Sequence, residues 1–228
     1  MSVPLSSGGQ TPDPQQPEAS EVVKEALHEA VQVSPAAILE VVKEAMQGQV
    51  VPTAHPPRPG WLILCPHRMV ESVAQVRPAE LTAQGIRGVI LDLDNTLVLW
   101  HQEEMAAEIT DWLEELKAAE LKLCILSNSV LSSRSQRIAE RIGCAFVRQA
   151  AKPSRQGFRK AMQAMETAPA DTTIVGDQMF TDILGGNRSG IYTIMVKPMQ
   201  KHEFLYTRYV SRPPEKLLLG WFKRKGHL

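Results

Sequence analysis

The chain has 228 residues, of which 43% are apolar, so it can hold one α/β domain with extensions and bury a sizeable core. Lys and Arg balance Asp and Glu at 25 each, and no run approaches the ~18 consecutive apolar residues that cross a bilayer, which excludes a helical membrane span. The first residues show neither a basic segment before a long apolar run nor an Arg-rich, acid-poor composition. We therefore expect no secretory signal and no organelle transit peptide.

The charge is unevenly spread along the chain. Residues 1–57 carry seven acids against two bases, a net charge of −5, whereas residues 197–228 carry eight bases against two acids, a net charge of +6. A basic end of this kind predicts contact with an anionic surface.

The three cysteines, Cys65, Cys124 and Cys144, lack the spacing of a metal site. Cys124 and Cys144 lie in or beside apolar, strand-like runs, which is typical of small core residues. Their odd number and burial favour a reducing compartment, so we expect a cytoplasmic location.

The N-terminal quarter divides into three segments. Residues 1–19 are rich in Pro, Gln, Ser and Gly and predict a disordered tail. Residues 20–49 repeat apolar side chains at helical spacing and predict a helical extension of two helices, which could form a hairpin, dock on the domain or bind a partner. Residues 50–60 contain several prolines and a glycine and predict a linker.

Residues 61–212 alternate strand-like and helix-like patterns and predict an α/β domain. A parallel sheet with helices on both faces follows from this alternation. The expected strands are residues 88–93, 121–126, 145–147, 172–177 and 192–196. Residues 213–228 form a basic amphipathic C-terminal segment.

Asp92 and Asp94 stand where the buried run Val89–Leu91 opens into a loop. Because side chains alternate along a strand, we expect both carboxylates to leave the strand on the same side. Buried carboxylates need compensation, so the pair indicates a metal, a shared proton or a reacting phosphorus atom. Acids that merely cap the next helix are the structural alternative.

Other polar residues follow the neighbouring strands. They are Ser127, Asn128, Lys152 and Asp177, with Asp182 shortly after. Ligand sites of open parallel sheets lie beyond these strand ends. Carboxylates from two strands would bind Mg²⁺, whereas a hydroxyl, backbone N–H groups and an ammonium would bind a phosphoryl group.

The carboxylate pair fits phosphoryl transfer, in which one Asp attacks phosphorus and the other moves the proton. Each neighbouring residue also has a structural alternative. Ser127 could be a helix N-cap, Lys152 a surface lysine, and Asp177 and Asp182 acids at a helix start.

The order of these motifs resembles the haloacid dehalogenase (HAD) phosphatase superfamily. The matching segments are Asp92-Leu-Asp-Asn-Thr96, Leu126-Ser-Asn-Ser129, Lys152-Pro153 and Gly176-Asp-Gln-Met-Phe-Thr-Asp182. The resemblance covers about residues 60–228 and implies a Rossmann-like core.

The resemblance also implies a role for each matching residue. It makes Asp92 the nucleophile and a Mg²⁺ ligand, and Asp94 the general acid/base with its backbone carbonyl on the metal. It places Ser127 and Lys152 at the substrate phosphate. Asp177 would be a metal ligand, and Asp182 a supporting acid.

A narrower resemblance, to YqeG-type phosphatases, rests on residues 87–98, 151–153 and 176–190. These proteins are similar to the phosphatidylglycerophosphatases of mitochondria and plastids, which implies phosphatidylglycerophosphate as substrate. Between Asp94 and Ser127, and between Ser129 and Lys152, the chain leaves no room for a cap domain, so we expect an open site.

The tail supports a lipid substrate independently of the resemblance. Leu217–Leu219, Trp221 and Phe222 beside consecutive bases suit an anionic membrane surface, and Trp61–Leu64 is a second candidate. Packing of both segments on the core is the alternative. We expect a peripherally membrane-associated enzyme and no nucleic-acid partner. A soluble phosphatase for a sugar phosphate or nucleotide, and a non-catalytic interaction module using residues 20–48, are the competing hypotheses.

Overall fold

The computed structural model describes residues 60–100, 102–129, 132–199 and 212–228. The predicted tail (1–19), the helical extension (20–49) and all but the last residue of the predicted linker (50–60) lie outside these described residues. The structural assignments of these three segments therefore stay predictions.

A six-stranded parallel sheet forms the centre of the fold, in the order β1-β6-β5-β2-β3-β4. Its strands are β1 (Arg68–Val70), β2 (Gly88–Leu91), β3 (Lys122–Leu126), β4 (Ala145–Val147), β5 (Thr172–Gly176) and β6 (Tyr192–Val196). All pairings are parallel, which confirms the predicted sheet. The edge strand β1 was not predicted, because three partly buried residues give no readable alternation.

Side chains of the central strands point alternately to the two faces of the sheet, so each face has its own hydrophobic cluster. Val89 and Leu91 of β2 contribute to one hydrophobic cluster, whereas Ile90 between them contributes to another on the opposite face. All residues of β2 are buried, as expected for a strand covered on both sides.

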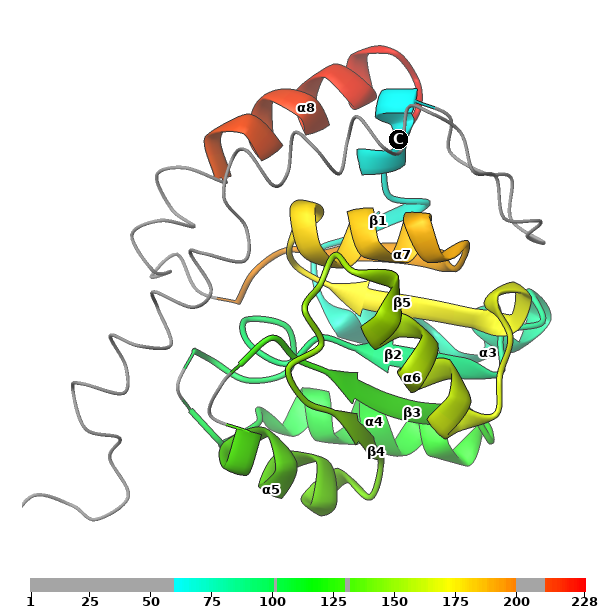
Figure 1. Cartoon of the computed structure of the whole chain (residues 1–228), viewed down its shortest axis with the longest axis vertical. Coiled ribbons are helices and arrows are strands. Elements are labelled where there is room, and N and C mark those ends of the chain that lie inside the picture. Colours follow the sequence, from blue (N-terminus) through cyan, green and yellow to red (C-terminus); the bar gives the residue numbers. More distant parts are fainter. Residues whose placement is uncertain (1–59, 101, 130–131, 200–211) are drawn as a thin grey trace, which may run out of the picture.

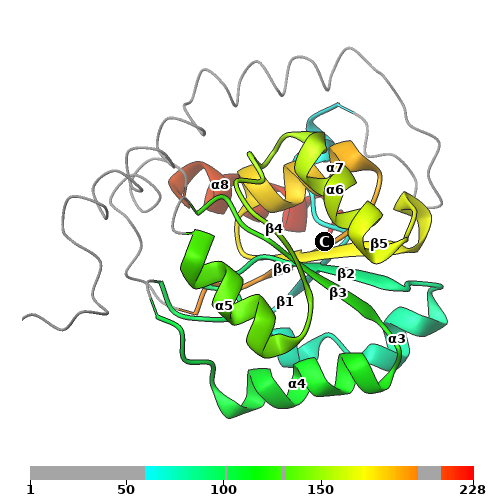
Figure 2. The same ribbon diagram turned by 60° about the horizontal axis from the view of Figure 1, so that its bottom comes forward.

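Helices cover both faces of the sheet (Figure 2). The face of Val89 is covered by α3 (Pro78–Ala83), α4 (Ala107–Ala118) and α5 (Ser132–Ile142), with the short 3₁₀ turn η2 (Val73–Gln75) beneath α4. The face of Ile90 is covered by α6 (Arg155–Met165), and α7 (Leu184–Ser189) packs beside α6 on β6. A further 3₁₀ turn, η3 (Pro169–Asp171), leads into β5.

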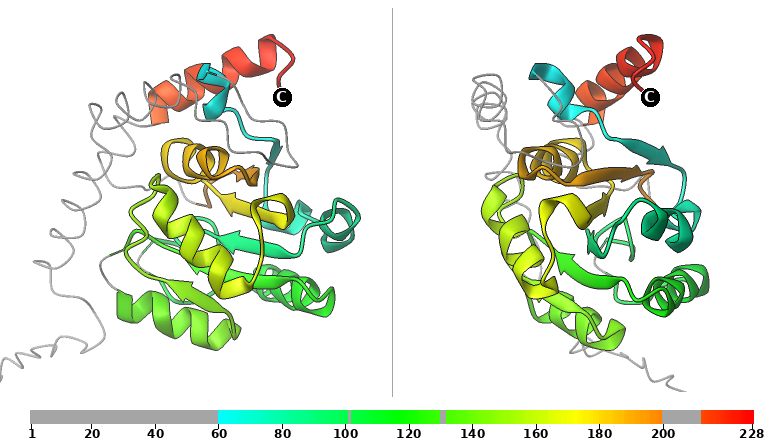
Figure 3. Two further views of the ribbon diagram at one scale, coloured as in Figure 1. Left: turned by 45° about the vertical axis from the view of Figure 1, so that its right-hand side comes forward. Right: turned by 90° about the vertical axis from the view of Figure 1, so that its right-hand side faces the viewer.

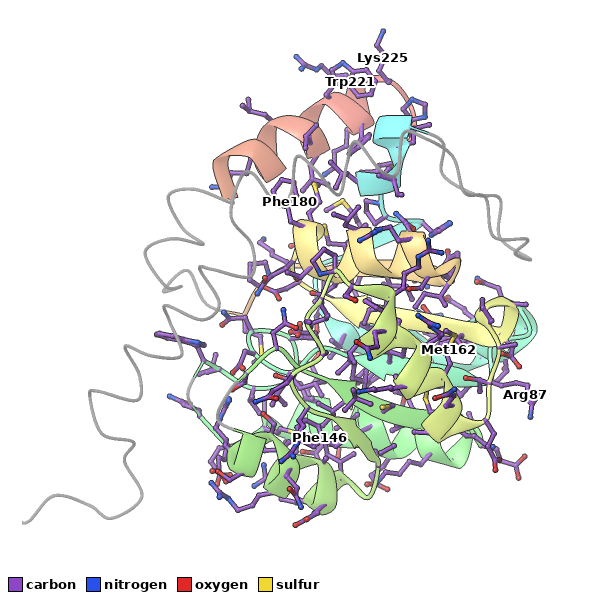
Figure 4. The ribbon with its side chains drawn as sticks, in the orientation of Figure 1. Arg87, Phe146, Met162, Phe180, Trp221 and Lys225 are labelled. Atoms are coloured by element: carbon purple, nitrogen blue, oxygen red, sulfur yellow. The ribbon has the colours of Figure 1, made fainter. Side chains whose placement is uncertain are left out.

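The C-terminal helix α8 (Arg212–Arg224) packs on two short elements and extends the second face (Figures 1 and 3). These elements are η1 (Gly60–Leu64), a 3₁₀ helix, and η4 (Met179–Ile183), a π-helical turn that runs directly into α7. Phe222 is fully buried in the cluster that contains Phe180 and Ile183 of η4, and Figure 4 shows Phe180 beneath α8.

This packing decides between the two hypotheses for the apolar residues of the tail. Leu218, Leu219 and Trp221 pack against the cluster around Phe222, and Leu217 alone of the tail's predicted apolar set is strongly exposed, at 75%. Ile63 and Leu64 of η1 are buried in the same cluster. Among the described residues, most of both candidate interfacial segments therefore belongs to the core.

The thiols of Cys124 and Cys144, which are buried and partly buried, behave as core groups. Burial raises the pKa of the Cys124 thiol to about 12 and that of the Cys144 thiol to about 11. Both are free cysteines, and these high pKa values keep them protonated and unreactive near neutral pH.

The connections at the carboxyl ends of the strands are short. Residues 92–106 join β2 to α4, and residues 127–131 join β3 to α5. The described residues of these two connections hold no cap domain, as expected. No helix within the described ranges has the length and apolar character needed to cross a bilayer.

Replacing Phe222 with alanine tests how far the fold depends on α8. We expect Phe222→Ala to lower the free energy of unfolding by about 3–5 kcal/mol, because it leaves a cavity in a closed cluster. Leu217→Ala on the exposed side of the same helix is the control and should change it by less than about 0.5 kcal/mol. Equal urea midpoints for the two variants would show that α8 does not contribute to the core.

Candidate active site

The candidate site lies at the switch point of the sheet. From the central strand β2 the chain first builds β3 and β4 on one side, and later β5 and β6 on the other. The carboxyl ends of β2 and β5 therefore flank the switch point, where open α/β sheets bind ligands. The backbone N–H of Asp92 donates to the Val175 carbonyl at 3.0 Å, which places Asp92 beside Asp177 at the end of β5.

A buried lysine joins the acids of this edge. The Lys152 ammonium donates to Oδ1 of Asp92 at 2.5 Å and to Oδ1 of Asp182 at 2.7 Å. All three side chains are at least nine-tenths buried. The surface-lysine alternative for Lys152 is therefore wrong.

Asn128 fixes the backbone from which this lysine extends. Its Oδ1 accepts a hydrogen bond from the Lys152 N–H at 2.7 Å, and its Nδ2 donates to the Lys152 carbonyl at 3.1 Å. The amide thus bonds both polar groups of one peptide segment. Asn128 is the second residue after β3, so the end of this strand helps to set the position of Lys152.

Asp182 comes from the π-helical turn η4. Its Oδ2 accepts from the Gln178 N–H at 3.0 Å, while its Oδ1 receives the lysine. Gly176 makes this approach possible, since a Cβ atom at that position would overlap the Asp182 carboxylate. Turns of this kind often occur at functional sites.

Burial and charge set the protonation of the cluster. Burial raises the pKa of Asp92 to about 7, even though the Lys152 ammonium acts in the opposite direction. Burial would lower the pKa of Lys152, but the carboxylates of Asp182 and Asp92 outweigh it and hold that pKa above its ordinary value. The lysine therefore stays charged beside the two buried acids, Asp92 and Asp182.

Three carboxylates of this edge fit a divalent cation. Oxygen atoms of Asp92, Asp177 and Asp182, one from each, lie within 4.8 Å of one another. Oδ2 of Asp92 is buried and has no hydrogen-bond partner among the described residues. An all-oxygen donor set with an excess of negative charge suits a hard cation such as Mg²⁺ rather than zinc.

The expectation that Asp94 accompanies Asp92 stays a prediction, and the charge of Asp94 is near enough to help raise the pKa of Asp92. Strand β2 ends at Leu91, so the alternation that underlies the expectation stops before the pair. A tight turn follows, closed by a hydrogen bond from the Leu97 N–H to the Leu93 carbonyl at 2.9 Å. The Asp94 carboxylate binds Arg134 of α5, with Nη2 at 2.6 Å from Oδ1.

Ser127 is buried at the end of β3, and its Oγ accepts from the Ser129 N–H at 3.1 Å. Because α5 begins at Ser132, Ser127 lies too far upstream to be its N-cap. A hydroxyl that accepts in this way still has its hydrogen to donate, which suits an anionic oxygen.

Sequence reasoning missed Arg134 and the reason for a glycine at position 176. An arginine on an amphipathic helix looks like any surface residue, and only the fold shows that this one is 6% exposed. The requirement for glycine at position 176 likewise depends on where Asp182 lies.

Comparison with known proteins assigns the family. The model of the haloacid dehalogenase-like hydrolases matches residues 15–190. The chain belongs to the haloacid dehalogenase-like hydrolases. This agrees with the motif order, the parallel sheet and the carboxylate cluster.

Individual relatives of this HAD-like chain vary in how much of their length it covers. It is 36% identical to YqeG of Bacillus subtilis (strain 168), described as a probable phosphatase, over 72% of this chain and 94% of that protein. It is 27% identical to phosphatidylglycerophosphate phosphatase 1, chloroplastic/mitochondrial, of Arabidopsis thaliana, over 71% of this chain but 49% of that protein. The chain thus spans about half the length of the plant relative.

A solved structure of an uncharacterized protein from Listeria monocytogenes serotype 4b is 20% identical to this chain. The match has a TM-score of 0.42 and covers 59% of this chain and 98% of that one.

Substituting Gly176 tests whether close packing positions Asp182. We expect Gly176→Ala to lower the free energy of unfolding by about 1–3 kcal/mol, because the methyl group displaces a buried, lysine-bound carboxylate. Gly220→Ala on α8, where a Cβ atom meets nothing within 4 Å, should instead be neutral or raise it by up to about 1 kcal/mol. A neutral Gly176→Ala in urea unfolding would contradict the assigned geometry.

Proposed function

We propose that this HAD-like hydrolase is a Mg²⁺-dependent phosphomonoesterase that works through an aspartyl-phosphate at Asp92. The observation that carries the proposal is the difference in contacts between the two carboxylate oxygens of Asp92. Oδ1 is held by Lys152, and Oδ2 is buried without a described partner. A carboxylate fixed by one oxygen presents the other one to an electrophile in a defined direction.

Two steps complete the proposed reaction. Oδ2 of Asp92 forms a bond to phosphorus while the bond from phosphorus to the ester oxygen breaks, and Asp94 gives its proton to that oxygen. Asp94 then takes a proton from water, whose oxygen bonds to phosphorus as the acyl-phosphate bond breaks. Inorganic phosphate leaves, Asp92 is again a carboxylate and Asp94 is again protonated.

The other residues of the site hold the phosphoryl group. Lys152 supplies a buried positive charge beside the nucleophile, and Ser127 supplies a hydroxyl donor at the end of β3. Asn128 acts through Lys152, since its amide bonds the backbone of that residue.

The cation would be held by Asp92, Asp177 and Asp182, with the backbone carbonyl of Asp94 as the further ligand expected from the family. When bound, Mg²⁺ would neutralise charge on the phosphoryl oxygens. The fit rests on the oxygen-only donor set and on the excess of carboxylates over ammonium groups.

For the substrate we propose phosphatidylglycerophosphate. The support is the plant relative, which carries that activity in its name, together with the absence of a cap over the described site. An uncapped site can reach a phosphate that stays anchored in a membrane. A soluble sugar phosphate or nucleotide is the alternative, and the substrate panel below separates the two.

A basic face on α8 is the structural support for a membrane surface. Lys216, Leu217, Lys223 and Arg224 are all exposed. By helical spacing, Leu217 and Arg224 lie on the side of α8 opposite Phe222, and Lys216 and Lys223 flank that side. Lys225 lies over the Trp221 ring, 5.9 Å from its centroid, at the outer end of the helix (Figure 4). Bases of this kind attract anionic lipid.

Phosphate release from a substrate panel tests the proposed function. The full chain should release phosphate from phosphatidylglycerophosphate in mixed vesicles faster than from glycerol 3-phosphate, a hexose phosphate or a nucleoside monophosphate, and chelation of Mg²⁺ should abolish release. Faster turnover of a soluble ester would favour the soluble alternative. No turnover of any phosphate would favour the interaction module.

Asp92→Asn tests the nucleophile. We expect turnover to fall by on the order of 10³-fold or more, because the amide cannot form the acyl-phosphate, while the nearly equal volume preserves packing. Asp111→Asn, an exposed acid on α4, should retain normal turnover. Turnover of Asp92→Asn within a few-fold of the wild type would rule out the mechanism.

Reversing two charges on α8 tests the membrane surface. Lys223→Glu/Arg224→Glu should weaken sedimentation with phosphatidylglycerol vesicles by roughly 30-fold or more, because each base contributes roughly 1 kcal/mol at such a surface. Arg159→Glu/Lys160→Glu on α6 makes the same change in net charge at exposed residues and is the control. Equal losses in both double variants would indicate a net-charge effect rather than a docking face.

A further inference from the structure

Arg134 is a buried arginine whose contacts join the candidate acid/base to a loop. Its Nη2 lies 2.6 Å from Oδ1 of Asp94, and its Nη1 lies 3.4 Å from Oδ2. Its Nε and Nη2 donate to the Gln102 carbonyl at 3.1 and 2.9 Å. The guanidinium is therefore fixed from one side while it holds a carboxylate on the other.

Two further arginines on the same face of α5 bind the same loop. The Arg137 guanidinium pairs with the Glu103 carboxylate, and Arg141 donates to the Glu103 carbonyl. Among the described residues, no hydrogen bond or ion pair joins either of them to Asp94, and the Arg137 side chain is 58% exposed, against 8% for Arg134. The three arginines thus share one structural task, and Arg134 alone adds the contact to Asp94.

We propose that Arg134 is a positioning residue that holds the Asp94 carboxyl group for proton transfer to and from the reacting oxygen. This inference rests on the proposed function, in which Asp94 is the acid/base. A guanidinium is planar, permanently charged and unable to act as an acid near neutral pH. It can therefore orient a carboxyl group without competing for its proton.

The position of Asp94 explains why its carboxyl group needs a contact that orients it. Asp94 follows the end of β2 in a tight turn, where neither a strand ladder nor a helix fixes its side chain. Its side chain is 17% exposed, more than those of Asp92 or Asp182. Of the contacts that the structure shows for this carboxylate, both come from Arg134, so its direction depends on α5.

The role has a chemical signature that a structural clamp lacks. In the first step the bond from phosphorus to the ester oxygen breaks, and the proton of Asp94 goes to that oxygen. A p-nitrophenolate ion leaves readily without a proton. Phenol is a weaker acid, so its oxygen depends more strongly on receiving a proton as it leaves. Losing the position of Asp94 should therefore slow phenyl phosphate more than p-nitrophenyl phosphate.

The test compares kcat/KM for these two esters, because this parameter reports the step in which the leaving oxygen departs. For Arg134→Gln in the full chain with Mg²⁺, we expect the loss on phenyl phosphate to exceed the loss on p-nitrophenyl phosphate by tenfold or more. Arg137→Gln, which loosens the same loop, should affect both esters equally. Arg134→Lys, which keeps the charge but loses the planar fork, should show the same selective loss to a smaller degree.

A double variant completes the test, because it separates a loss of positioning from a loss of activity caused by misfolding. In an Asp94→Asn background the side chain can no longer give a proton. Adding Arg134→Gln to that variant should therefore leave the ratio of kcat/KM for the two esters unchanged. Equal losses on both esters for Arg134→Gln and Arg134→Lys would overturn the positioning role while leaving the proposed phosphatase intact. Failure of the wild type to hydrolyse either ester would overturn the proposed function, and this inference with it.

Discussion

The buried ammonium of Lys152 is the interaction on which the site depends. It lies between Asp92 at the end of β2 and Asp182 in η4, at least nine-tenths buried with both. Removing one member of such a group typically costs about 3–5 kcal/mol, because the remaining charges lose their compensation. Every other feature of the site serves to bring these three side chains to one point or to orient a group around them.

The supports of the cluster come from distant parts of the sequence. Asn128 positions the Lys152 backbone from the end of β3, and Gly176 leaves space for Asp182 at the end of β5. Helix α8 covers η4, the turn that carries Asp182, because Phe222 of α8 and Phe180 of η4 belong to one buried cluster. The C-terminal helix is therefore part of the architecture of the site, and its basic face lies on the side turned away from that contact.

Strand patterns and the residues at strand ends could be predicted from the sequence because both depend on local periodicity. The expected strand at 192–196 matches β6, and four of the expected polar positions, Asp92, Lys152, Asp177 and Asp182, meet in the structure. The end of β2 could not be predicted, since the expected strand runs to residue 93 whereas β2 ends at Leu91. The partnership with Arg134 was equally hidden, because it joins residues forty positions apart.

The most direct test of the account is to identify the residue that carries the phosphoryl group. The full chain would be mixed with p-nitrophenyl phosphate and Mg²⁺, quenched in acid during turnover, reduced with borohydride and digested for mass spectrometry. Borohydride converts an aspartyl-phosphate to homoserine. The account predicts homoserine at position 92, and none in Asp92→Asn. Modification at another residue, or turnover without any modified aspartate, would contradict it.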